Sequence, residues 1–156
     1  KIIFQELKRK HLFTDKLTWA VELEPGPLFV LNDFDSLRRL CSLIDNSAEL
    51  SGSVGINVDI AHYRMAFLAS HGDAQAGLHV LRNDPAVFSR IAHSHIAGHH
   101  PCAHFGDLSL SYHQNVESDF LPWLELLSER ASLGSKPIPF SNLVSIELEA
   151  TLAESA

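Results

Sequence analysis

The chain has 156 residues and carries 12 Lys and Arg against 19 Asp and Glu, a formal charge of −7 with the histidines neutral. An apolar share of 46% and a charged share of 20% exclude a disordered or collagen-like chain, and no apolar stretch approaches the roughly 20 residues that span a bilayer. The acidic balance makes nucleic acid an unlikely partner, because affinity for phosphate backbones comes largely from Lys and Arg.

The first part of the chain alternates strand-like and helix-like segments. Leu17–Glu24 is rich in strand formers and stops at the Pro25-Gly26-Pro27 turn, which cannot continue a ladder. Asn32 or Asp33 then caps a predicted helix. Its apolar residues fall on one face, and they are Phe34, Leu37, Leu40, Cys41 and Ile44. A second apolar run, Val54–Ile60, predicts a second strand.

The middle of the chain is predicted to be helical and then extended. The segment from His62 to Arg90 favours two helical pieces, with breaks near Gly72 and at Pro85, where Asp84 supplies a cap. Ile91–Ala97 predicts a third strand. Gly98–Gln114 is a long loop without a clear period, and loops of this length are often functional.

The last part of the chain continues the alternation. A helix is predicted from about Glu117 to Ala131, and Asn142–Ala150 is predicted to be the fourth strand. Strands that alternate with helices are typical of an α/β fold with a parallel sheet. We therefore predict four parallel strands covered by helices.

All four predicted strands carry metal-ligating side chains near their C-terminal ends. In parallel α/β proteins these ends meet at the edge of the sheet that holds the active site. A buried carboxylate is costly unless it is paired, and a divalent cation would serve as such a partner. The residues concerned are Glu22 and Glu24, Asp59 and His62, His93 and His95, and Glu147 and Glu149.

Four segments in order, VELEPGP, VGINVDIAH, IAHSHIAGHH and VSIELEA, resemble the C-terminal half of the xylose-isomerase-like TIM barrels. This family includes sugar phosphate isomerases/epimerases, ketose 3-epimerases and type IV apurinic endonucleases. The most specific pieces are the D-x-x-H of Asp59 to His62 and the H-x-H of His93 to His95. The resemblance implies a (β/α)8 barrel, of which residues 1–156 form a single domain with the fifth to eighth strands.

Carried over by position, the resemblance implies four metal ligands and two catalytic bases. The ligands are Glu24, Asp59, His95 and Glu147, and the bases are Glu24 and Glu147. His62, His93 and His104 are implied to contact substrate. Because side chains alternate along a strand, Glu22 shares a face with Glu24, as Glu149 does with Glu147, so the register decides each pair. We favour Glu24, which is nearer the turn, and Glu147, whose surroundings match the family's strand better.

These residues favour a metal-dependent isomerase or epimerase acting on a sugar, sugar phosphate or polyol. In this reaction a divalent cation stabilises an enediolate while carboxylates move the proton. Three oxygen ligands with one nitrogen favour Mn²⁺, Co²⁺ or Mg²⁺, with Zn²⁺ as the alternative. Ketose epimerases have a substrate-binding Arg where this chain has Pro101, so they are a poor guide to the substrate.

Two other functions remain open. An apurinic-endonuclease-like phosphodiesterase agrees with the histidine-rich segment but not with the acidic charge or with Cys102, which stands where the endonucleases have Asp. A catalytically idle, metabolite-binding barrel is the other alternative. A piece with four βα units exposes two sheet edges, which favours a homo-oligomer. With only two cysteines, the chain is expected in a reducing compartment and hence in the cytoplasm.

Overall fold

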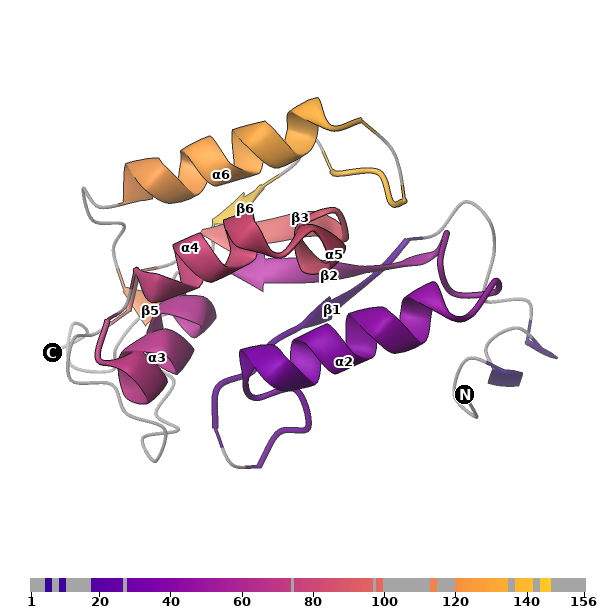
Figure 1. Ribbon diagram of the computed structural model, residues 1–156, viewed down its shortest axis with the longest axis horizontal. Coiled ribbons are helices and arrows are strands. Elements are labelled where there is room, and N and C mark those ends of the chain that lie inside the picture. Colours follow the sequence, from indigo (N-terminus) through magenta and orange to yellow (C-terminus); the bar gives the residue numbers. More distant parts are fainter. Residues whose placement is uncertain are drawn as a thin grey trace, which may run out of the picture.

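The computed structural model describes ten stretches of the chain, and the strands among them confirm the predicted parallel α/β architecture. These stretches are residues 5–6, 9–10, 18–26, 28–73, 75–96, 98–99, 113–114, 120–134, 137–141 and 144–146. Four strands form one parallel sheet in the order β1-β2-β3-β6, and helices lie along it (Figure 1). The sheet is open, with β1 and β6 at its edges.

The described residues of the parallel sheet form four strands, of which the first two are shorter than the sequence pattern predicts. They are β1 (Trp19–Glu22), β2 (Val54–Asp59), β3 (Ile91–Ile96) and β6 (Ser145–Ile146). The first strand stops at Glu22, two residues before the expected end, because the chain then turns and the Glu24 N–H bonds the Leu31 carbonyl at 2.8 Å. Glu24 therefore lies in the loop after β1.

Three of the described helices begin directly after an aspartate whose side chain caps them. In α2 (Phe34–Asp45), Asp33 accepts the Ser36 N–H, and the Ser36 side chain accepts the Asp33 N–H in return, which forms a capping box. Asp84 caps α5 (Pro85–Phe88) as predicted. The remaining helices are α3 (Ile60–His71), α4 (Ala76–Asn83) and α6 (Leu121–Ser132).

The predicted long loop begins and ends in a small antiparallel ladder. Its two strands are β4 (Gly98–His99) and β5 (His113–Gln114), and β4 contacts α3. Residues 100–112 of the loop, which include His104, lie outside the described residues. The ladder therefore places both ends of the loop beside α3, at the carboxyl edge of the sheet.

The hydrophobic core lies between the sheet and the helices. Ile56, Val58 and Ile91 supply it from the strands, and Leu37 and Trp123 are among the helical residues that pack against it. Burial of such side chains is the main force that holds the helices on this face. No helix within the described ranges has the length and apolar content that crossing a membrane requires.

Candidate metal centre at the carboxyl edge of the sheet

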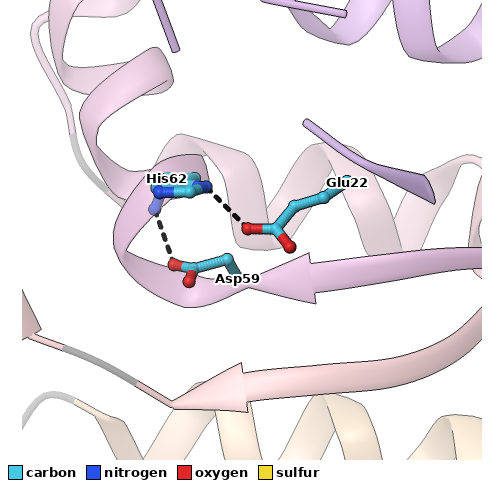
Figure 2. A group of neighbouring side chains, drawn as sticks. All are labelled: Glu22, Asp59 and His62. Carbon is cyan, nitrogen blue, oxygen red and sulfur yellow. Dashed lines mark hydrogen bonds and ion pairs between the residues drawn. The ribbon is translucent and has the colours of Figure 1, made fainter. Parts of the chain in front are cut away.

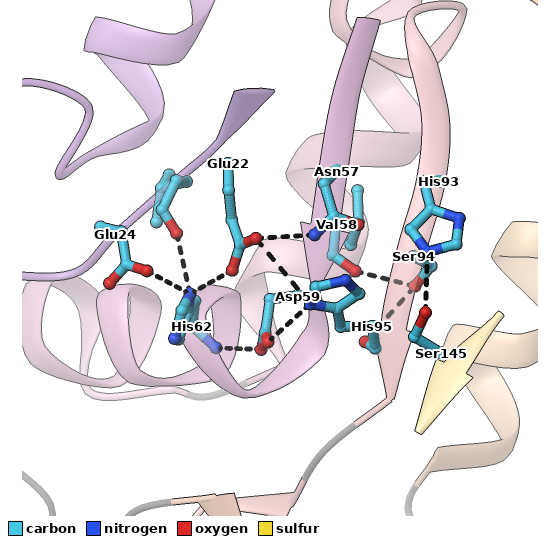
Figure 3. A network of polar contacts seen from close by, with 11 residues as sticks. Glu22, Glu24, Asn57, Val58, Asp59, His62, His93, Ser94, His95 and Ser145 are labelled. Atoms are coloured by element: carbon cyan, nitrogen blue, oxygen red, sulfur yellow. Dashed lines mark hydrogen bonds and ion pairs between the residues drawn. The ribbon is translucent and has the colours of Figure 1, made fainter. Parts of the chain in front are cut away.

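The face of the sheet opposite the core carries polar side chains in two rows near the carboxyl edge. The strand register pairs Glu22 with Asn57 and Asn57 with His93, which forms the first row across β1, β2 and β3. The second row pairs Asp59 with His95 and His95 with Ser145. Since alternate residues of a strand share a face, both rows lie on the same side of the sheet (Figure 3).

Asp59 and His62 are held together by the start of α3. Asp59 is the last residue of β2 and also the N-cap of α3, and its Oδ1 accepts the His62 N–H at 3.0 Å. This cap explains the D-x-x-H spacing, because an N-cap side chain bonds the N–H three residues later. Asp59 is fully buried and His62 is 3% exposed.

Glu22 completes a group of three metal-ligating side chains (Figure 2). Its Oε1 lies 2.9 Å from His62 Nδ1, and its Oε2 accepts the Asn57 Nδ2–H at 2.7 Å. One ligand atom from each of Glu22, Asp59 and His62 lies within 4.8 Å of the other two. Two strands and one helix therefore bring two carboxylates and an imidazole to a common point.

His95 extends this group from the third strand. Its Nδ1 lies 3.8 Å from Glu22 Oε2 and 3.8 Å from Asp59 Oδ2. The His93 ring stands edge-on to the His95 ring at 5.4 Å, and its Nε2 lies 3.0 Å from Ser145 Oγ. His95 thus lies between the two carboxylates, while His93 links β3 to β6.

Glu24 lies near the group but outside its centre. Its Oε1 is 3.8 Å from His62 Nδ1, and its side chain is 36% exposed. The sequence pattern favours Glu24 over Glu22 as the ligand, whereas the structure groups Glu22 with Asp59 and His62. Glu147 and Glu149 lie beyond the last described residue of β6, so the choice between them stays a prediction.

The carboxylates around His62 control its protonation. Burial lowers the pKa of His62, but the hydrogen bond to Glu22 and the charges of Asp59, Glu24 and Glu22 together outweigh that effect and raise it. The Nδ1 atom also faces the Leu23 carbonyl at 3.1 Å, so two acceptors compete for one proton. The group thus favours positive charge, whether a proton or a cation supplies it.

Asn57 is a polar residue of the site that the sequence pattern does not identify as a site residue. Its position is recognisable from the two-residue period, because Asn57 precedes Asp59 by two residues on the same strand. The amide did not stand out because it lies within an otherwise apolar run, VGINVDI.

Two cavities of the structure are lined by other residues than Glu22, Asp59 and His62. A cavity of about 370 Å³ lies beside His93, Ala20 and Phe140, toward the N-terminal ends of the strands. A larger cavity of about 660 Å³ lies away from the group, between α2 and α3, where Phe34 and His71 line it. We place the candidate metal centre at Glu22, Asp59 and His62, because a cation is held by converging ligand atoms and these side chains supply them.

Comparisons with known proteins found no matching family model, curated protein or solved structure.

Proposed function

We propose that the chain is part of a metal-dependent isomerase or epimerase that moves a proton on a sugar, sugar phosphate or polyol. The observation that carries this proposal is the convergence of Glu22, Asp59 and His62 within 4.8 Å, with His95 3.8 Å from both carboxylates. The open parallel sheet is compatible with half of a xylose-isomerase-like barrel. In such a barrel, this edge of the sheet would hold the active site.

The donor set fits a divalent cation. Two carboxylates with imidazole nitrogens suit Mn²⁺, Co²⁺ or Zn²⁺, and a harder ion such as Mg²⁺ would rely mainly on the carboxylates. Asp59 is fully buried, and a buried carboxylate costs several kcal/mol unless positive charge offsets it. Glu22, Asp59, His62 and His95 would hold the ion, and Glu22 replaces Glu24 among the ligands proposed from sequence.

The remaining carboxylates are available for proton transfer. When bound, the cation would polarise a substrate carbonyl and stabilise the charge that develops beside it. Glu24, whose side chain is 36% exposed, lies at the rim of the group and can accept a proton from the adjacent carbon. We propose Glu147 as the second base, on the side of the substrate opposite Glu24. We propose that His93 binds a substrate hydroxyl in place of Ser145 Oγ, which lies 3.0 Å from His93 Nε2.

Mn²⁺ binding by the purified chain tests the metal centre. The chain should bind Mn²⁺, and Glu22→Gln should weaken binding by about tenfold or more, because it removes a charged ligand. The matched control is Glu129→Gln, which alters a surface carboxylate paired with Arg82 at 2.9 Å, and it should leave Mn²⁺ binding unchanged. Equal affinity for the wild type and Glu22→Gln would reject the proposed centre.

Solvent exchange tests the reaction itself. With Mn²⁺ and a panel of aldoses, ketoses and their phosphates in deuterated water, a proton-transferring enzyme should place deuterium on carbon beside the carbonyl. Glu24→Gln should slow that exchange by about 100-fold while retaining most of the Mn²⁺ affinity. Cleavage of abasic DNA without any exchange would replace the isomerase by a nuclease. Mn²⁺ binding without either activity would support a binding protein.

A further inference from the structure

Asn57 is the middle residue of the first polar row, which crosses β1, β2 and β3 beside the candidate metal centre. Its register partners are Glu22 on β1 and His93 on β3, so it lies between a proposed ligand and a proposed substrate contact. The side chain is only 4% exposed. Figure 3 shows its amide directed at the Glu22 carboxylate.

The two carboxylate oxygens of Glu22 contact different neighbours, and His95 Nδ1 also lies 3.8 Å from Oε2. Asn57 Nδ2 donates to Oε2 at 2.7 Å, while Oε1 lies 2.9 Å from His62 Nδ1. A carboxylate held by one oxygen cannot rotate freely about its last bond. The amide of Asn57 therefore fixes which oxygen faces His62.

Stability of the sheet does not account for an asparagine at this position. Asn is depleted in strands, and every residue of β2 is buried. A buried amide costs free energy unless all its polar atoms are bonded, and Asn57 Oδ1 has no hydrogen-bond partner among the described residues. An apolar residue would pack here without that cost, so the amide serves another purpose.

We propose that Asn57 is a positioning residue for Glu22. By bonding Oε2 it directs Oε1 at the point shared with Asp59 and His62, and so prepares the carboxylate to receive a cation. Hydrogen-bond partners of metal ligands act in this way in many metal sites. The inference rests on the proposed metal centre, but it makes a separate prediction about a residue that is not itself a ligand.

The decisive experiment is a double-mutant cycle on Mn²⁺ affinity, measured from the electron paramagnetic resonance signal of free Mn²⁺. Asn57→Leu keeps the number and branching of side-chain heavy atoms but removes the donor, and it should weaken Mn²⁺ binding by about 10- to 100-fold. In a Glu22→Ala background, which removes the acceptor, the same change should have little further effect, because its action passes through Glu22. An equal loss in both backgrounds, or no loss in either, would overturn the proposal.

A structural control separates positioning from damage to the sheet. Val58→Ala alters the next residue of β2, which is equally buried but faces the core, and it should leave Mn²⁺ affinity within about twofold. If circular dichroism shows that Asn57→Leu does not fold, Asn57→Ala replaces it. This smaller side chain also lacks the donor, so the same weakening of Mn²⁺ binding is expected.

Nuclear magnetic resonance gives a readout that does not depend on affinity. The side-chain amide signals of Asn57, identified by their loss in Asn57→Ala, should include one proton shifted downfield by the charged acceptor. That shift should disappear in Glu22→Ala. A signal that stays the same in Glu22→Ala would contradict the hydrogen bond and with it the positioning role. If the wild type keeps the shifted signal but binds no Mn²⁺, the hydrogen bond stands and the proposed metal centre is contradicted.

Discussion

Ile91 and His93, two residues apart on β3, face opposite sides of the sheet. In a regular strand they would share a face, because side chains alternate. Here Ile91 pairs with Ile56 and His93 pairs with Asn57, which are consecutive residues of β2. Ala92 is therefore an extra residue without a register partner, and the strand contains a β-bulge at this point.

The bulge allows one strand to supply both the core and the site. Ile91 is fully buried among core residues, whereas His93 and His95 lie on the polar face with Asn57 and Asp59. The Ala92 carbonyl accepts the Ser141 N–H at 2.6 Å, which stabilises the irregular segment from outside the ladder. Bulges beside active sites commonly redirect side chains in this way.

The first prediction concerns Gly55, which lies against the bulge. A Cβ at this position would lie 2.6 Å from Ala92 Cβ and 2.8 Å from the Arg90 carbonyl oxygen. Gly55→Ala should therefore lower the free energy of unfolding by about 1 to 3 kcal/mol, measured by urea denaturation. Gly52→Ala is the matched control, because a Cβ there meets nothing within 4 Å. Equal midpoints for the two variants would argue against the tight packing at the bulge.

The second prediction is the pH dependence of stability without metal. The raised pKa of His62 means that the folded chain holds its proton more strongly than the unfolded chain, whose ordinary value is 6.5. The resulting stability is fully present below pH 6.5 and is lost as the pH rises through the folded-state value. In chelator, the unfolding free energy of the wild type should fall across this window more steeply than that of His62→Gln.

Its control is His79→Gln, which changes an exposed histidine on α4. That variant should retain the slope of the wild type, because it leaves Glu22, Glu24 and Asp59 around His62 intact. Parallel slopes for the wild type and His62→Gln would contradict the favourable pairing of protonated His62 with these carboxylates.

The third prediction concerns Arg90, a guanidinium that is 1% exposed at the opposite end of β3. It is ion-paired with Asp45 and donates to the carbonyls of Ser51 at 3.2 Å and Val54 at 2.9 Å. Arg90→Met should reduce the unfolding free energy by about 2 to 4 kcal/mol, because it leaves buried acceptors unsatisfied.

Two comparisons separate the contributions of Arg90. Asp45→Asn should cost about 1 kcal/mol or less, since the Asp45 side chain is 47% exposed and the pairing is partly screened. Arg39→Met, at an exposed position on α2, should change stability by no more than about 0.5 kcal/mol. If Asp45→Asn lowered the unfolding free energy as much as Arg90→Met, the ion pair alone would account for the stabilisation by Arg90.

Local sequence signals are sufficient to predict the order and type of the main elements. Asp84, and either Asn32 or Asp33, mark helix starts in the sequence, since a cap bonds N–H groups only two or three residues away, and the structure selects Asp33 of the pair. The D-x-x-H spacing likewise brought Asp59 and His62 together through one helical turn. Such local signals can be read along the chain, because the interacting atoms are close in sequence.

The side chains that meet at the candidate centre are brought together by contacts between distant segments. Glu22 lies closer to the centre than Glu24 because β1 ends at Glu22 and is aligned with Asn57 by the ladder, a register that alternation alone does not specify. The bulge at Ala92 sets the faces of Ile91 and His93 through packing against Gly55. These outcomes depend on contacts between segments more than 30 residues apart, where the register and packing of whole strands outweigh local preference.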